Sequence, residues 1–160
     1  MTTSATGSYT GFEVSSRMTG NLQQLLADLV ALHLQCKQAH WNVVGHNFRD
    51  LHLQLDEIVD EAREAADTIA ERMRALGATP DGRVPTVAAS ATLSEFPAGE
   101  QDVRNVVDLI TARLNATAGT ARAIHDSVDD EDPSTADLLH GIIIALEKRA
   151  WMLSAENSAA

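Results

Sequence analysis

The sequence has little of the chemistry that supports disulfides or membrane insertion. It contains one cysteine among 160 residues, Cys36, so a disulfide within the chain is impossible, and this usage fits a reducing compartment. No apolar run approaches the ~20 residues that a membrane-spanning helix needs. Residues 1–20 lack the basic segment and apolar run of a signal peptide. We therefore expect a cytoplasmic protein with no membrane partner.

Basic residues are also scarce. Lysine and arginine together number 12 against 23 aspartates and glutamates, which gives a formal net charge of −11. Such a surface repels phosphate backbones and attracts cations. Residues 1–20 carry one basic side chain, Arg17, and no basic residue follows Arg149. The charge balance favours a metal ion or another cation over nucleic acid as the partner.

Apolar residues recur with helical periodicity in most of the chain, and no alternating β-branched run indicates a strand. Gly45, Gly77 and Pro80 are expected to end helices. Three prolines in 77–98 predict a long loop, with a short helix near 87–91. The sequence predicts one all-α domain over 17–157, an antiparallel four-helix bundle with a long second connection, after a flexible tail over 1–16. The four helices are expected at 19–44, 48–76, 99–128 and 134–156.

Four potential metal ligands share one face of the second predicted helix. His52/Asp56 and Asp67/Glu71 are both i,i+4 pairs, so each pair projects from one turn. Asp56 and Asp67, however, lie about 16 Å apart along the axis at ~1.5 Å per residue. The four positions are symmetric about residues 61 and 62. Two antiparallel copies of this helix would therefore form two metal sites, each shared between subunits.

His40, near the end of the first predicted helix, would face His52 across the short turn. Two imidazoles and three carboxylates suit iron, manganese or zinc better than copper(I). The competing interpretation is that these are solvated surface charges. Their symmetric spacing and the apolar residues close by, such as Leu55 and Ile58, favour the metal site.

Three motifs resemble the Dps family of mini-ferritins: the stretch 37–48 (KQAHWNVVGHNF), Leu51-His52-x-x-x-Asp56, and the stretch 67–72 (DTIAER). The resemblance covers spacing and identity over residues 37–77. It implies a ferritin-like fold and a hollow homo-dodecamer of tetrahedral symmetry. It also implies a ferroxidase that oxidises Fe(II) with hydrogen peroxide, stores ferric mineral and so protects DNA from oxidative damage. The family's ligands carry over onto His40, His52 and Asp56, with Asp67 and Glu71 from the neighbouring subunit.

The resemblance also assigns residues around the centre. Lys37 and Trp41 match positions beside it: Lys37 is a candidate partner of Asp56, or a solvated lysine, and Trp41 is a candidate cover of the site, or an ordinary packed aromatic. Cys36 is expected to be a small buried filler.

The acidic turn before the last predicted helix has two interpretations. The resemblance implies a three-fold pore lined by Asp129, Asp132 and Asp137, whose carboxylates would draw Fe(II) inward. A favourable interaction with the helix dipole explains Asp132 and Asp137 equally well. Asp137 and His140 also form an i,i+3 pair, although a surface role is the commoner one for such a histidine.

Two other functions stay open at this point. Dps relatives often compact DNA through lysine-rich tails, so nucleoid association is the alternative function. This sequence lacks such a tail, and weak DNA binding is therefore expected. A bundle adaptor without chemistry is disfavoured by the intact ligand set. The residues do not decide between iron, zinc and manganese as the resting metal.

Overall fold

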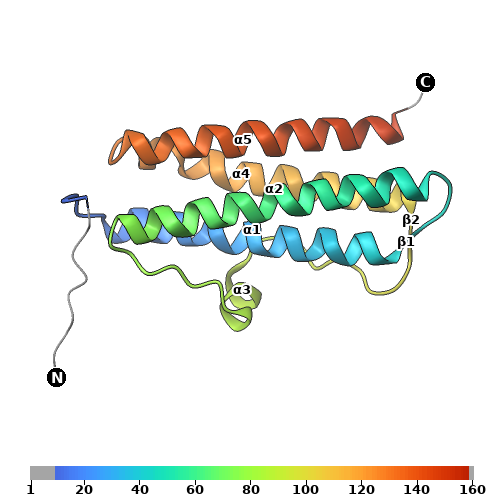
Figure 1. The fold of residues 1–160 in the computed structure, drawn as a ribbon, viewed down its shortest axis with the longest axis horizontal. Helices are drawn as coiled ribbons and strands as arrows, with labels where there is room; N and C mark the ends of the chain where they lie inside the picture. The colour runs from blue at the N-terminus through green and yellow to red at the C-terminus, as the bar shows by residue number, and fades with distance from the viewer. Residues whose placement is uncertain (1–9, 159–160) are drawn as a thin grey trace.

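The computed structural model describes residues 10–158, in which four long helices lie side by side along one axis (Figure 1). They are α1 (Ser16–Asn42), α2 (Phe48–Ala75), α4 (Val103–Asp129) and α5 (Pro133–Ser154). A short helix, α3 (Val84–Ser90), lies in the second connection, and a 3₁₀ turn, η1 (Ala155–Asn157), follows α5. The predicted all-α bundle is confirmed. Most of the predicted tail, residues 1–9, lies outside the described residues.

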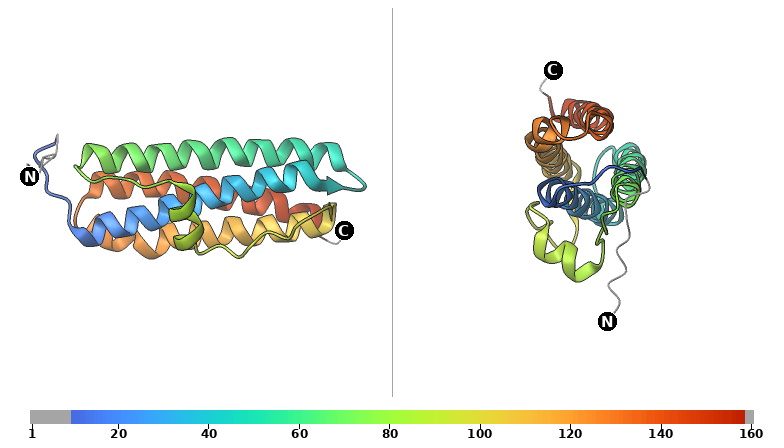
Figure 2. Two further views of the ribbon diagram at one scale, coloured as in Figure 1. Left: turned by 90° about the horizontal axis from the view of Figure 1, so that it is seen from below. Right: turned by 90° about the vertical axis from the view of Figure 1, so that its left-hand side faces the viewer.

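The order of the helices explains the long connection. α1 packs against α2 and α4, and α5 packs against α4 and α2, so the helices occupy four corners when viewed along the axis (Figure 2). Each neighbouring pair is antiparallel, and α2 and α4 therefore run in the same direction. The chain must return along the whole bundle between them, with α3 lying outside against α1.

Contrary to the expectation that strands are absent, two short strands join the hairpin turn to the end of this connection. β1 (Val43–Val44) pairs in parallel with β2 (Gln101–Asp102). Two residues per strand are too few to give a sequence signal. The pairing fixes the α1–α2 turn against the start of α4, next to the turn that carries Gly45 and Asn47 in positive-φ conformations.

A buried carboxylate anchors the long connection to α1. Asp28 is 0% exposed, and its oxygens accept hydrogen bonds from the Thr92 amide (2.7 Å), the Thr92 hydroxyl (2.8 Å) and the Thr120 hydroxyl (2.7 Å). A carboxylate is tolerated in the interior only when its oxygens are satisfied in this way. Asp28 therefore ties α1, the connection and α4 together.

A buried guanidinium does the same from α4. Arg113 donates to the carbonyls of Ser94 (3.1 Å) and Glu95 (2.8 Å) and to the side chain of Gln35. Its guanidinium carbon lies 5.3 Å from the centre of the Phe96 ring. Because the connection has so little regular structure, these side-chain bonds position it.

The apolar stripes predicted from the sequence face one another and form a continuous core. Cys36 is buried in this core, as expected of a small filler. Burial raises the pKa of its thiol to about 12, so the reactive thiolate is suppressed. The largest fully buried side chains are Met18, Leu22, Leu25, Leu29, Leu32, Leu51, Leu55, Ile58, Ile69, Met73, Leu76 and Ile110.

The start of α1 differs from the prediction. α1 begins at Ser16 rather than Thr19, because Ser15 is the N-cap and its hydroxyl accepts from the Met18 amide (3.0 Å). The Ser15 amide and hydroxyl donate to Glu131, 2.7 Å each. This partner lies beyond α4 and stabilises Ser15 in the capping position.

The start of α4 also differs. α4 begins at Val103 rather than near Gly99, because Asp102 is its N-cap and accepts from the Asn105 amide (3.2 Å). Its end, like that of α2 before Gly77 and the start of α5 at Pro133, lies within a residue or two of the prediction. Among residues 10–158, no helix combines the length and the apolar character that crossing a membrane requires.

Candidate metal centre

His40 and His52 face each other across the α1–α2 hairpin. Their rings are stacked, with centroids 3.6 Å apart and planes 19° apart. His40 Nδ1 lies 2.8 Å from the carbonyl oxygen of His52, and His52 Nδ1 lies 2.9 Å from the carbonyl oxygen of His40. A carbonyl can only accept, so both Nδ1 atoms carry hydrogen. Each neutral ring then has its lone pair on Nε2, which is the arrangement of metal-binding histidines.

Asp56 completes this half of the centre, one turn after His52. One of its oxygens lies 3.3 Å from His40 Nδ1 and 2.5 Å from Lys37 Nζ. The hydrogen bond from Lys37 holds the pKa of Asp56 below its usual value, against a smaller opposing effect of burial. The carboxylate is therefore ionised and ready for a cation. The candidate pair of Lys37 with Asp56 is present in the structure.

Asp67 and Glu71 lie farther along α2 and are both exposed. Asp67 lines a separate pocket of about 530 Å³ with His33, Arg63 and Glu64. Across residues 10–158, the structure brings no three His, Cys, Asp or Glu side chains close enough to hold a metal ion. One chain therefore presents two incomplete half-sites, His40/His52/Asp56 and Asp67/Glu71.

Two exposed aromatic side chains neighbour the histidine half-site. Trp41, which follows His40 in the sequence, is 67% exposed. The Phe48 ring, 41% exposed, lies 5.0 Å from that of His52. Within the single chain, Trp41 is therefore not packed in the way that the second interpretation of this residue required.

The fold agrees with comparisons to known proteins. A family model described as a ferritin-like domain matches residues 19–158. The DNA protection during starvation protein of Agrobacterium fabrum is 35% identical over 141 residues, which are 88% of this chain and 87% of that protein.

The chain belongs to the Dps family of ferritin-like proteins.

Other Dps proteins support the same assignment. The DNA protection during starvation protein 2 of Deinococcus radiodurans is 35% identical over 91% of this chain, although the match spans only 60% of that longer protein. The DpsA14 structure from Streptomyces coelicolor has a TM-score of 0.87 at 31% identity and covers 93% of both chains. A Microbacterium arborescens Dps structure in its high iron form has a TM-score of 0.80 at 33% identity, over 91% of this chain and 97% of that one.

The three aspartates of the predicted pore differ in exposure and in hydrogen bonding in this Dps chain. Asp129 and Asp137 are exposed. The side chain of Asp132 is only 13% exposed and accepts from Arg72 Nη2 (2.7 Å) and the Thr135 hydroxyl (2.6 Å). Burial raises the pKa of Asp132, but the bonds from Thr135 and Arg72 outweigh it and leave the pKa lowered. Asp132 therefore links α2 to the start of α5, whether or not it also lines a pore.

Sequence reasoning missed two features of this molecule. Arg72 adjoins the ligand candidate Glu71, but its bond to Asp132, 60 residues away, has no local sequence signal. His125, which the sequence did not single out, lies against His140 from the neighbouring helix. The i,i+3 spacing of Asp137 and His140 was the one visible sign of that cluster.

Proposed function

We propose that this Dps chain oxidises and stores iron, using centres that two subunits share. The observation that carries the proposal is the reciprocal bonding of His40 and His52 to each other's backbone carbonyls. It leaves the lone pair of each ring on Nε2, one turn before the ionised Asp56 on α2 in the case of His52, and this donor set of imidazoles and carboxylate suits ferrous iron. A solvated surface histidine would not require this arrangement.

The second half-site supports a shared centre. Asp67 is about 16 Å from Asp56 along α2 at ~1.5 Å per residue, so one ion cannot contact both on the same chain. If α2 of a second copy crosses antiparallel near residues 61 and 62, its Asp67 and Glu71 face His40, His52 and Asp56. The exposed Trp41 and Phe48 would then be covered by that copy.

The assembly follows from this requirement. We propose a closed homo-oligomer, with twelve subunits as the family resemblance implies, because each centre needs two chains and every chain carries both halves. A chain that stays monomeric at micromolar concentration by light scattering or native mass spectrometry would contradict the proposal.

Ferrous iron is the substrate of the proposed reaction. Two Fe(II) ions each give one electron to hydrogen peroxide, which takes up two protons and leaves as two water molecules. Asp56, Asp67 and Glu71 supply the negative charge that stabilises the Fe(III) products. Hydrolysis of Fe(III) then deposits ferric mineral inside the shell. Consumption of both ferrous iron and peroxide suppresses the formation of hydroxyl radical. This suppression would protect DNA without direct contact between the protein and DNA.

Direct DNA binding is the second candidate, because several relatives are named for DNA protection. The net charge of −11 opposes it, and the cations Arg72, Arg83, Arg122 and Arg149 are already paired with carboxylates. We expect weak duplex binding at physiological salt, because few cations are available for phosphates. A gel shift that persists at high salt and disappears when residues 1–16 are deleted would reverse this ranking.

The shared centre can be tested by complementation. His52→Ala removes a ligand from one half-site and Glu71→Ala removes one from the other, so each homo-oligomer should lose rapid peroxide-driven iron oxidation. In mixed shells, about half of the interfaces pair the two variants, and one of the two centres there is intact. Co-refolded shells should therefore recover about a quarter of wild-type activity in stopped-flow absorbance measurements.

His46→Ala, a change in an exposed histidine of the α1–α2 turn, is the matched control for co-refolding. It should behave as wild type alone and in mixtures. Mixed His52→Ala and Glu71→Ala shells that are no more active than either parent would show that each centre lies within one chain.

A further inference from the structure

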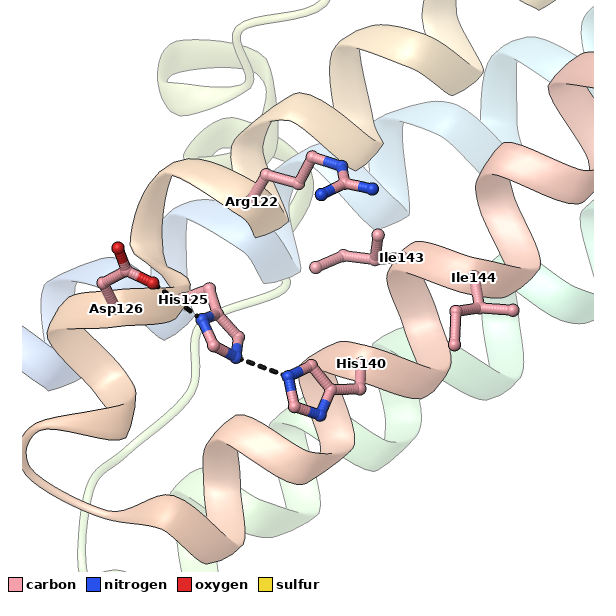
Figure 3. A pocket seen from close by; sticks show the side chains of 6 residues that line it. All are labelled: Arg122, His125, Asp126, His140, Ile143 and Ile144. Atoms are coloured by element: carbon pink, nitrogen blue, oxygen red, sulfur yellow. Dashed lines mark hydrogen bonds and ion pairs between the residues drawn. The ribbon is translucent and has the colours of Figure 1, made fainter.

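A second histidine pair lies on the surface formed by α4 and α5 (Figure 3). His125 Nε2 and His140 Nε2 are 2.7 Å apart, and the ring centroids are 4.6 Å apart with planes 25° apart, so the rings meet through their Nε2 edges. The side chain of His125 is 21% exposed and that of His140 is 56% exposed. Two imidazole nitrogens therefore converge at a place that solvent reaches.

The opposite side of each ring faces a carboxylate. His125 Nδ1 lies 3.0 Å from Asp126 Oδ1, and His140 Nδ1 lies 3.7 Å from Asp137 Oδ1. An ionised carboxylate only accepts, so both aspartates favour the hydrogen on Nδ1. The two Nε2 lone pairs would then point at each other across 2.7 Å and repel. A cation between them, either a proton or a metal ion, removes this repulsion.

The surroundings are compatible with a bound ion. The pair lines a pocket of about 280 Å³ with Ile143, Ile144 and Arg122. The guanidinium of Arg122 would oppose a metal ion, but it is paired with Glu147 through Nη2 at 2.9 Å and through Nε. Its positive charge is therefore largely compensated, while Asp126 and Asp137 supply negative charge next to the rings.

We propose that His125 and His140 bind a divalent first-row transition-metal ion through their Nε2 atoms, at a site separate from the centre of His40 and His52. Zinc–nitrogen bonds of ~2.0–2.1 Å in tetrahedral geometry place two ligating nitrogens about 3.3 Å apart. The pair would open by about 0.6 Å to reach this spacing, which a rotation of the exposed His140 side chain provides.

The donor set defines the class of ion. Imidazole nitrogens select zinc, copper, nickel, cobalt and ferrous iron over magnesium and calcium, which prefer oxygen. No third His, Cys, Asp or Glu within residues 10–158 is placed to complete a three-ligand site, so water fills the remaining positions. Asp137 is also a candidate pore residue, but the metal site does not depend on that role.

The test is calorimetric titration of the assembled, metal-free protein with Zn²⁺, and with Co²⁺ as a spectroscopic probe. His140→Ala should remove about one bound ion per chain, both in wild type and in the Glu71→Ala background that lacks the shared centre. His46→Ala, in an exposed histidine of the α1–α2 turn, is the matched control and should remove none. The same loss in both backgrounds separates this site from the proposed ferroxidase centre.

A second pair of variants tests the role of the carboxylate. Asp137→Asn should keep the number of ions but weaken the affinity by about tenfold, the usual effect of a residue that orients a ligand. Asp130→Asn, in an exposed carboxylate of the adjacent turn, should leave the affinity within about twofold.

Two results would overturn the proposal. One is an unchanged stoichiometry and affinity in His140→Ala, confirmed with His125→Asn. The other is the absence of an anomalous peak between the two Nε2 atoms in cobalt-soaked crystals. Either result would mean that the pair shares only a proton.

Discussion

The two histidine pairs of this molecule are built from the same chemistry and stabilised by different partners. In His40/His52 each Nδ1 is fixed by a backbone carbonyl of the opposite helix. In His125/His140 each Nδ1 faces an exposed aspartate side chain, and the two Nε2 atoms meet. Backbone acceptors fix a ring rigidly, whereas carboxylates at the surface are screened and mobile. The first pair is therefore suited to a preorganised metal centre, and the second to a metal site whose ligands can move to fit the ion.

The largest expected effect is on catalysis at the first pair. Asp56→Asn removes the charge of a proposed ligand and the partner of Lys37, so peroxide-driven iron oxidation should fall by at least tenfold. Asp60→Asn, in an exposed aspartate one turn later on α2, is the control and should stay within about twofold. Stopped-flow absorbance after addition of Fe(II) and peroxide measures both. Equal rates in the two variants would show that Asp56 is only a surface partner of Lys37.

A smaller effect is expected on stability, where the two pairs should differ. His40 is 7% exposed. His40→Ala creates a cavity and removes the hydrogen-bond donor of the His52 carbonyl. The expected cost is about 2–4 kcal/mol, seen as a fall of several degrees in the thermal unfolding midpoint. His140→Ala exposes no buried group and should shift the midpoint by about a degree or less. Similar shifts for the two variants would remove the proposed contrast in rigidity.

The smallest expected effect concerns acid stability at the end of the bundle near the second pair. The pKa of Asp132 is lowered in the folded chain, so its ionised form stabilises the fold at pH values above the unfolded pKa of about 3.9. This contribution is lost as the pH falls through the lower folded value. Asp132→Asn should therefore melt a few degrees below wild type at pH 7, and the difference should shrink towards pH 3.

Calorimetric scans between pH 7 and pH 3 measure this difference, with Asp130→Asn as the control in the same turn. Asp130 is exposed, so its variant should follow wild type throughout. A difference for Asp132→Asn that grows on acidification would mean that its ion pair with Arg72 is not what stabilises the turn.

Much of the architecture could be predicted because its causes are local. Gly77 ends α2 and Pro133 begins α5 because their backbone preferences act within one or two residues. The starts of α1 and α4 were less predictable. Ser15 is chosen as a cap partly through Glu131, 116 residues away, and Asp102 is placed where β2 meets β1.

The candidate centre could be predicted for a similar reason. The spacing of His52, Asp56, Asp67 and Glu71 on one helix is a property of the sequence, and helical geometry converts it into two half-sites. The spacing could not show that His40 and His52 bond to each other's carbonyls, because that depends on how closely α1 and α2 approach.

By itself, the sequence determined the helical class, the core-facing stripes and the spacing of the two sets of candidate ligands along α2, because helical periodicity is read within a few residues. Only the tertiary structure decided which nitrogen of His40 and His52 is left for a metal, that Asp28 and Arg113 anchor the long connection, and that His125 lies against His140. Each of these depends on contacts between helices distant in sequence, where packing of the core sets the distances and local propensity has no influence.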